Sequence, residues 1–472
     1  MRLASLDYAR LAQVEDPDYK KYSPILNDDK YSTIELEFNI NEPLPRQPAP
    51  RFFSKDSLKW IGIRNTQKVN QSVDAWKWAF REKRKFEHVL REFQRLNKEL
   101  GRILPLWTAA QIKLSKEQTS QSKTSQQNEN AQRLGIAPHA RLWQLSSNAD
   151  AKGADFILRA YSLDAPQDAR TIAVGKLTNG RKSRQDNVLV EYKGYRPCDS
   201  SAPSTSVRER VQPLAKQLAR LLASAGEHEL STLPLKGIIE QEPQQRYAFV
   251  FDYPKNTDCT QAPMSLYTMI HLNNMDNRLD LQQRFSVAQT ISRSIGAFHA
   301  DGWVHKSMRS ESIAFFHRQN STDLIVSAPY LINFEFSRPE TAATLLDFDD
   351  DLERNLYRHP HRQGPPKASF SRLHDIYALG IVLLEIGLWQ TAASIFNQAV
   401  SDLPKHAQFK PEGIQSIFVN AARKRLAHHM GQPYLEAVLA CITDSFNDQT
   451  SRADFPIMFY EEVVIKLSIS TK

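Results

Sequence analysis

A long polar stretch without any hydrophobic side chain most constrains what this chain can fold into. Residues 115–130 contain only Ser, Lys, Glu, Gln, Thr and Asn. Such a segment cannot contribute to a hydrophobic core, and its composition is typical of a flexible linker. The sequence therefore predicts two folded parts, separated by a polar linker at residues 111–134.

The overall composition agrees with more than one domain. The chain has 472 residues, whereas a domain averages roughly 150 residues. No apolar run reaches the roughly 18 residues that a transmembrane helix needs, and the N-terminus lacks the apolar region of a secretory signal. Cys198, Cys259 and Cys441 lie far apart, which argues against a disulfide scaffold and against a C-x-x-C zinc site. We therefore expect a cytoplasmic protein without a transmembrane span.

The part before the linker is predicted to contain a long amphipathic helix. Apolar residues recur at steps of three and four from Phe86 to Leu104, with charged residues on the other face, and Pro105 ends the pattern. This apolar stripe must pack against other helices or another chain, so self-association stays open. Residues 51–106 carry 14 basic and 6 acidic side chains. Without a nucleic-acid-binding motif, this excess favours a solvated helix face over nucleic-acid binding.

The part after the linker changes from strands to helices. Runs rich in β-branched and aromatic residues predict five strands, with one helical run between the third and the fourth, and four long helices follow. The sequence predicts an α+β fold with a small β-rich lobe at residues 135–254 and a large helical lobe at residues 255–472. The strands are predicted at residues 156–163, 171–177, 188–192, 235–240 and 247–253, and the helices at residues 207–223, 281–300, 373–388, 414–429 and 434–447.

A series of motifs in this part resembles those of protein kinases. Residues 299–315, HADGWVHKSMRSESIAF, are similar to the catalytic loop, and residues 331–335, LINFE, stand where a kinase has D-F-G. Residues 375–385, DIYALGIVLLE, match a helix of the large lobe, and residues 188–193, VLVEYK, match the lysine-bearing strand. Further similarities are the YRHP sequence at residues 357–360 and the late arginine Arg452. The resemblance implies a two-lobed protein-kinase-like fold.

The chain departs from the kinase pattern where the chemistry takes place. Ser307 stands at the catalytic-loop aspartate, Ser312 at the asparagine that binds the second magnesium ion, and Asn333 at the D-F-G aspartate. A hydroxyl is a poor base at neutral pH, and an amide lacks the charge that magnesium prefers. The Gly-rich loop is also missing, because Gly175 and Gly180 are isolated glycines. The resemblance therefore implies a pseudokinase, with no intact catalytic residue and no magnesium site.

Lys193 and Glu335 remain candidates for binding a nucleotide and a metal ion, respectively. Lys193 is the nucleotide-binding candidate, so ATP is the one cofactor that the resemblance leaves open. Its usual partner would be a glutamate in the helix at residues 207–223, which offers only Glu209 near its start. Glu335 shares a strand side with Asn333 and is a weak candidate for a substitute metal ligand. We expect no other metal site, because the histidines lack ligand spacing.

Three further residues match structural positions of the kinase core. His305 and Phe334 match residues that pack in that core. Asp375 matches the helix residue whose carboxylate caps the backbone of the catalytic loop. We expect these three residues to stabilise the fold without taking part in catalysis.

The N-terminal helix carries a second resemblance. Residues 76–100 are similar to the last helices of the fungal HET-s/LopB domain (HeLo, prion-inhibition and propagation), an all-helical bundle in proteins of self/non-self recognition, or heterokaryon incompatibility. This resemblance assigns residues 56–110 to a HeLo-like segment and leaves residues 1–55 poorly defined. It implies protein partners. The apolar first helix of that family has no counterpart here.

Three functions remain open from the sequence. The first is a catalytically degenerate kinase-like domain that serves as a protein-interaction or signalling module. The second is a divergent, weakly active Ser/Thr protein kinase that uses ATP. The third is a membrane-active cell-death protein.

Overall fold

The structure of the chain is a computed structural model, and it describes residues 88–97, 100–101, 104, 156–166, 172–180, 185–195, 204–224, 230–272, 278–340, 342, 351–363, 369–401, 410–443, 445–446 and 455–468. The chain divides into two units, Met1–Arg84 and Lys85–Lys472, and every described residue belongs to the second unit. The predicted region 1–55, the linker 111–134 and Arg452 lie outside the described residues.

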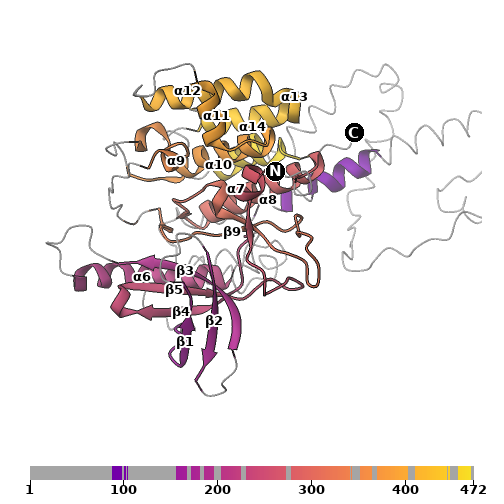
Figure 1. Cartoon of the computed structure of the whole chain (residues 1–472). Coiled ribbons are helices and arrows are strands. Elements are labelled where there is room, and N and C mark those ends of the chain that lie inside the picture. Colours follow the sequence, from indigo (N-terminus) through magenta and orange to yellow (C-terminus); the bar gives the residue numbers. More distant parts are fainter. Residues whose placement is uncertain are drawn as a thin grey trace, which may run out of the picture. The chain divides into compact units, whose positions relative to one another are not determined.

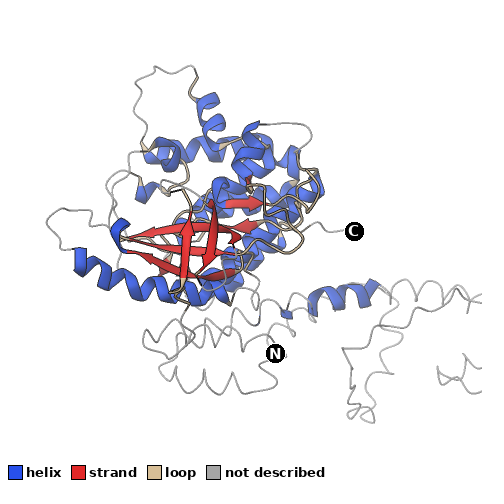
Figure 2. Cartoon of the chain, turned by 60° about the horizontal axis from the view of Figure 1, so that its bottom comes forward, coloured by secondary structure: helices blue, strands red, loops and turns tan. Residues whose placement is uncertain are grey.

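The second unit contains both helices and an antiparallel sheet, which confirms the α+β part of the predicted fold class. Its main sheet has five antiparallel strands in the order β1-β2-β3-β5-β4. These strands are β1 (Tyr161–Asp164), β2 (Ala173–Asn179), β3 (Gln185–Gly194), β4 (Leu235–Gln241) and β5 (Arg246–Phe251). Figure 2 shows the strands in red and the helices in blue.

The two faces of this sheet bury different sets of side chains, because successive residues of a strand point to opposite faces. Val188 and Val190 of β3 belong to a small apolar cluster with Ala173, Leu177, Ala248 and Val250. Leu189 of β3 belongs to the large core instead, together with Phe249 and Phe251 of β5. Glu191 and Lys193 continue the Leu189 face, so alternation points both side chains toward the large core.

The remaining described elements are mostly helices. The helix α6 (Ser204–Ala223) contacts β4 and runs beside the sheet (Figure 1). The helices that follow the sheet are α7 (Leu266–Leu272), α8 (Leu281–Ala300), α9 (Leu352–Asn355), α10 (Arg372–Leu388), α11 (Ala392–Ala399), α12 (Pro411–Ala421), α13 (Ala427–Met430), α14 (Gln432–Ile442) and α15 (Phe455–Phe459).

The helix α10 forms the centre of the large core. All its residues from His374 to Leu388 are buried. It lies against α14 at Gly380, where an added Cβ would come within 2.5 Å of Ile442 and 2.6 Å of Cys441. Only a residue without a side chain fits this close approach of two helices.

Short strands hold the loops between the helices in place. The strand β7 (Trp303–Val304) pairs with β10 (Arg338–Pro339), and β8 (Ile313–Phe315) pairs with both β6 (Met264–Ser265) and β9 (Tyr330–Leu331). These pairings bring residues 303–315 next to residues 330–339.

Several predicted elements differ from the structure at their ends. The predicted strand 156–163 becomes an isolated bridge at Ile157 and the strand β1, with a turn at residues 159–160 between them. The predicted helix 414–429 consists of α12, a π-helical turn at Ala422–Leu426, and α13. The helix predicted at residues 434–447 ends at Ile442.

The described part of the N-terminal helix is helical at residues 88–97, 100–101 and 104. Its apolar stripe is exposed, with 61% of Val89 and 60% of Phe93 accessible to solvent. Among all described helices, none is by itself long and apolar enough to cross a membrane, although α10 and α11 meet that criterion jointly as a pair bent by 81°.

Candidate functional site

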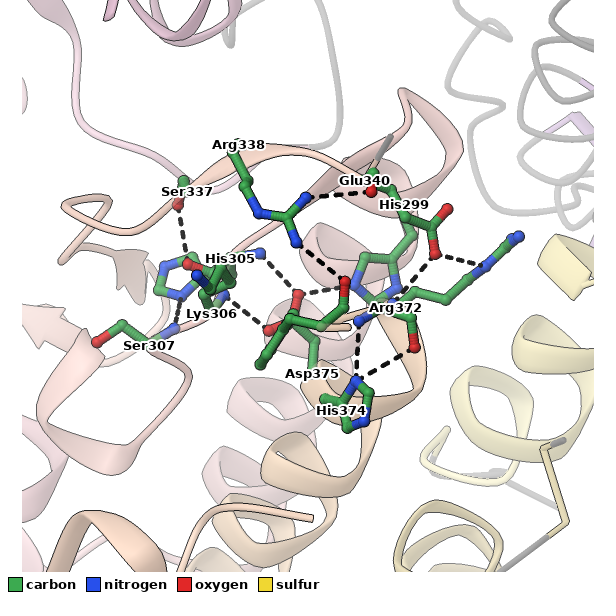
Figure 3. Close-up of polar contacts among 12 residues, drawn as sticks. His299, His305, Lys306, Ser307, Ser337, Arg338, Glu340, Arg372, His374 and Asp375 are labelled. Carbon is green, nitrogen blue, oxygen red and sulfur yellow. Dashed lines mark hydrogen bonds and ion pairs between the residues drawn. The ribbon is translucent and has the colours of Figure 1, made fainter. Parts of the chain in front are cut away.

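The carboxylate of Asp375 lies at the centre of a buried polar cluster (Figure 3). Its Oδ2 accepts hydrogen bonds from the backbone N–H of His305 at 2.6 Å and from Nε2 of His299 at 3.1 Å. Its Oδ1 accepts from the backbone N–H of Lys306 at 2.8 Å. A single side chain of α10 thus fixes the loop that follows β7.

These three donors determine the charge state of Asp375. Burial alone would raise the pKa of this carboxyl group, but the hydrogen bond from His299 and the backbone donors hold the pKa below its ordinary value. Lys306 adopts a left-handed φ of 65°, and its N–H donates to the same carboxylate as that of His305. Asp375 is therefore an ionised structural anchor at neutral pH.

His305 is a neutral packing residue in this cluster. Its Nε2 donates to the carbonyl oxygen of Ile332 at 3.1 Å, and its Nδ1 accepts from the N–H of Ser307 at 3.3 Å. Burial lowers the pKa of His305 to about 4, which agrees with this neutral tautomer. Its ring meets that of Phe334 edge to face at 5.0 Å, and Phe334 in turn packs against Phe298.

The structure brings Ser307, Ser312 and Asn333 together. The Nδ2 of Asn333 donates to the hydroxyl oxygen of Ser312 at 3.3 Å and to the carbonyl oxygen of Glu311 at 3.3 Å. The hydroxyl of Ser312 donates to the carbonyl oxygen of Ser307. Ser307, Ser312 and Asn333 are all uncharged, and Ser312 and Asn333 use their polar side-chain groups to join neighbouring loops.

Glu191 is a central residue of the site that the sequence analysis missed. It is 4% exposed, and its carboxylate accepts from the backbone N–H groups of Asn333 at 2.7 Å and Phe334 at 2.8 Å. Burial raises the pKa of Glu191 to about 7, although the two backbone donors oppose the shift. The signal was present in the sequence, because Glu191 lies two residues from Leu189 and Lys193 and so shares their strand face.

Lys193 is buried and held by the same segment. Its Nζ donates to the carbonyl oxygens of Glu335 and, at 3.1 Å, of Ser337. Burial lowers the pKa of Lys193 to about 7. Glu209, the glutamate available in α6, is exposed and makes no bond with Lys193.

Glu335 contributes its backbone to the site, while its side chain is exposed. In the part of the chain that the structure describes, no group of three or more His, Cys, Asp or Glu side chains could hold a metal ion. Gly175 lies inside β2, where an added Cβ would come within 2.8 Å of Ala165. This glycine therefore serves strand packing.

A second buried network lies at the other end of α10. Glu385 is fully buried and accepts from the hydroxyl of Tyr357 and the N–H of Ala392, both at 2.7 Å. Burial raises the pKa of Glu385 to about 7. Tyr357 also bonds Ser310 at 3.0 Å and lines a pocket of about 150 Å³. The other residues of this pocket are Tyr267, Arg309, Glu311, Asp351, Glu353, Arg354, Leu356 and Ala393.

Fold and site together define an α+β protein in which buried polar side chains join an antiparallel sheet to a helical part. Residues 198–467 match the model of a family described as a domain of unknown function, DUF7580. The match covers more than half of the chain, and the protein belongs to this family. No curated protein matches the chain. The matched segment contains Ser307, Ser312, Asn333 and Asp375, whereas Glu191 and Lys193 precede it.

Proposed function

We propose that this protein is a pseudokinase, a kinase-like domain that has lost phosphoryl transfer and acts by binding protein partners in signalling. The observation that carries the proposal is the neutral set of Ser307, Ser312 and Asn333 at the positions where the resemblance requires a base and two metal ligands. In a kinase these groups orient the substrate hydroxyl and hold magnesium. Here Ser312 and Asn333 bond to each other and to nearby carbonyl groups.

The buried cluster around Asp375 supports the same proposal. It has the arrangement expected if Asp375 caps the backbone of a catalytic-type loop, with two backbone donors and His299 around one carboxylate. The packing of His305 against Phe334 fits the same scheme. A chain that keeps such a scaffold while it lacks charged catalytic groups is suited to presenting a fixed surface to a partner.

The proposed biological setting rests on the resemblance of residues 56–110 to HeLo domains. We place the protein in fungal self/non-self recognition, with self-association through the helical segment. The exposed Val89 and Phe93 are consistent with a helix that contacts another chain.

A phosphoryl-transfer assay tests the proposal. The full chain, incubated with ATP and magnesium, is expected to show neither autophosphorylation nor transfer to a generic protein substrate. Loss of a general base usually costs about 100- to 10,000-fold in rate, and absent metal ligands add to that loss. The triple change Ser307→Asp, Ser312→Asn, Asn333→Asp is expected to remain inactive, because a phosphate-binding glycine loop is also required.

Measurable phosphoryl transfer would instead support the hypothesis that the protein is a divergent, weakly active kinase. Such transfer would consist of magnesium-dependent autophosphorylation by the unmodified chain that disappears in Lys193→Ala. A thermal-shift titration with ATP, with and without magnesium, gives an independent measure. A ligand at 100 times its dissociation constant stabilises the folded state by about 2.7 kcal/mol, so a shift only with magnesium would also favour a kinase.

A further inference from the structure

We propose that Glu191 is a built-in anion that occupies an anion-binding site of the backbone and so excludes phosphate-bearing ligands from Lys193. The inference rests on the proposed function, because Lys193 is the nucleotide-binding candidate of the kinase-like site. It assigns to Glu191 the role of a specificity-determining residue.

The anion-binding site is formed by two successive backbone N–H groups. Asn333 has a left-handed φ of 69°, and the N–H groups of Asn333 and Phe334 both donate to the Glu191 carboxylate, at 2.7 and 2.8 Å. A concavity of successive N–H groups, called a nest, binds anions such as phosphate in many proteins. The nest of this protein is filled by its own carboxylate.

Lys193 is engaged by the same five-residue segment. Its Nζ donates to the carbonyl oxygens of Glu335 and Ser337, and the side chain is almost fully buried. In the described part of the chain, the side chains of Glu191 and Lys193 form hydrogen bonds with the backbone of residues 333–337. Glu191 and Lys193, two residues apart on β3, therefore bind the same segment. Glu191 accepts from its backbone amides, and Lys193 donates to its backbone carbonyls.

A phosphate group that approached Lys193 would meet two obstacles. Above about pH 7, where Glu191 is ionised, it would encounter a carboxylate of like charge in a buried environment, where charges interact more strongly than in water. It would also have to displace two charge-assisted hydrogen bonds, which are stronger than neutral ones. Removing the carboxylate removes both obstacles and leaves the nest free to accept an anion.

The test is a gain of binding. Wild type, Glu191→Ala and the matched control Glu209→Ala are titrated with ATP and with tripolyphosphate, by calorimetry and by thermal shift. Glu209 suits the control because it is an exposed acid on α6. Glu191→Ala is expected to bind ATP at least about tenfold more tightly than wild type, whereas the control equals wild type. Loss of the gain in Glu191→Ala/Lys193→Met would assign the binding to Lys193.

Binding of tripolyphosphate as tight as that of ATP would identify a polyphosphate site, whereas preference for ATP would identify a nucleotide site. The inference is overturned if folded Glu191→Ala binds no more tightly than wild type, or if wild type itself binds ATP tightly. Glu191→Gln serves as the milder variant, and circular dichroism establishes folding before each titration. In Glu191→Gln the amides of Asn333 and Phe334 are expected to exchange hydrogen faster than in wild type, and unchanged exchange would contradict the proposal.

The outcomes separate the inference from the proposed function. Phosphoryl transfer by the wild-type chain would refute the pseudokinase proposal. A folded Glu191→Ala variant without ATP binding, in a chain without transfer activity, would refute only the role of Glu191.

Discussion

Two buried carboxylates of this protein hold loops in the same way but differ in their ionisation. Asp375 accepts from the successive N–H groups of His305 and Lys306, and Glu191 accepts from those of Asn333 and Phe334. In each pair one residue has a left-handed φ, 65° at Lys306 and 69° at Asn333. In both places, two successive backbone N–H groups thus bind one carboxylate that comes from a distant element.

The difference lies in what else surrounds each carboxylate. Asp375 has a third donor, His299, and its pKa is lowered despite burial. Among the described residues, the hydrogen-bond donors to Glu191 are the two backbone N–H groups of Asn333 and Phe334. Glu191 also lies near the negative charge of Glu335, and burial raises its pKa to about 7. Two backbone amides do not offset the burial of a carboxylate here, whereas two amides and an imidazole do.

Removal of the Asp375 carboxylate is expected to have the largest effect on stability. Asp375→Ala leaves two backbone N–H groups and His299 without their acceptor in the core, so we expect a loss of about 3–5 kcal/mol in the free energy of unfolding. Urea denaturation measures it. Asp375→Asn keeps one acceptor oxygen and should lose less. An unchanged midpoint in Asp375→Ala would contradict the anchoring role.

The pH dependence of stability distinguishes the ionisation of the two carboxyl groups. The pKa of Glu191 is about 7 in the folded state against 4.5 for the free side chain, so the folded state takes up the proton first as the pH falls. This group therefore favours folding below about pH 7, and its contribution is lost as the pH rises from about 4.5 to 7. The stability difference between wild type and Glu191→Gln should change by about 3 kcal/mol between about pH 5 and pH 8.

The matched variant Asp375→Asn should show no such change over the same range. The pKa of Asp375 is already below its ordinary value of 3.8, so this residue stays ionised throughout. The pKa of Lys193 is lowered from 10.5 to about 7 in the folded state, so the folded protein gains stability as the pH rises from about 7 to 10.5. Lys193→Met should remove this gain, so its stability should differ from wild type in its pH dependence above pH 7. Equal slopes for all variants would show that these groups do not titrate differently in the folded state.

The third donor of Asp375 provides a smaller test. His299→Leu removes the imidazole that lowers the pKa of Asp375, at a cost of about 1–2 kcal/mol. Because a lowered carboxyl pKa gives stability that is lost on acidification, the variant should begin acid unfolding at a higher pH than wild type. Circular dichroism during acid titration measures this onset. An onset at the wild-type pH would mean that the backbone donors alone lower the pKa.

Removal of an exposed carboxylate is expected to have the smallest effect on stability. Asp280 caps α8, where its Oδ1 accepts from the N–H of Gln283 at 2.7 Å in an exposed position. Asp280→Ala should cost about 1 kcal/mol, because water can satisfy the free amide. A loss as large as that in Asp375→Ala would show that burial does not explain the difference between these two carboxylates.

The sequence predicted the regular elements better than the contacts between them. The predicted helix 281–300 coincides with α8, and the helix predicted at residues 373–388 differs from α10 by one residue, because long periodic apolar patterns leave few alternatives. The predicted helix 414–429 contains a π-helical turn that its pattern did not reveal. Such a turn depends on packing between helices, which local sequence does not specify.

The site was predictable where a residue acts within a known motif. Asp375 and His305 were singled out by resemblance, whereas the role of Glu191 depends on which distant segment meets its strand face. The hydrogen-bond acceptors of Lys193 could not be predicted from the sequence either, because they are backbone carbonyl groups, which every residue type carries.

The separation in sequence of these contacts has a kinetic consequence. Asp375 bonds residues 69 to 76 positions away, whereas Glu191 reaches residues 142 and 143 positions away. Contacts that close longer loops carry a larger entropic cost and tend to form after the local ones. We therefore expect the bonds of Glu191 to be absent from the folding transition state. Their loss should accelerate unfolding and leave the folding rate almost unchanged, since interactions formed late mainly slow the escape from the native state.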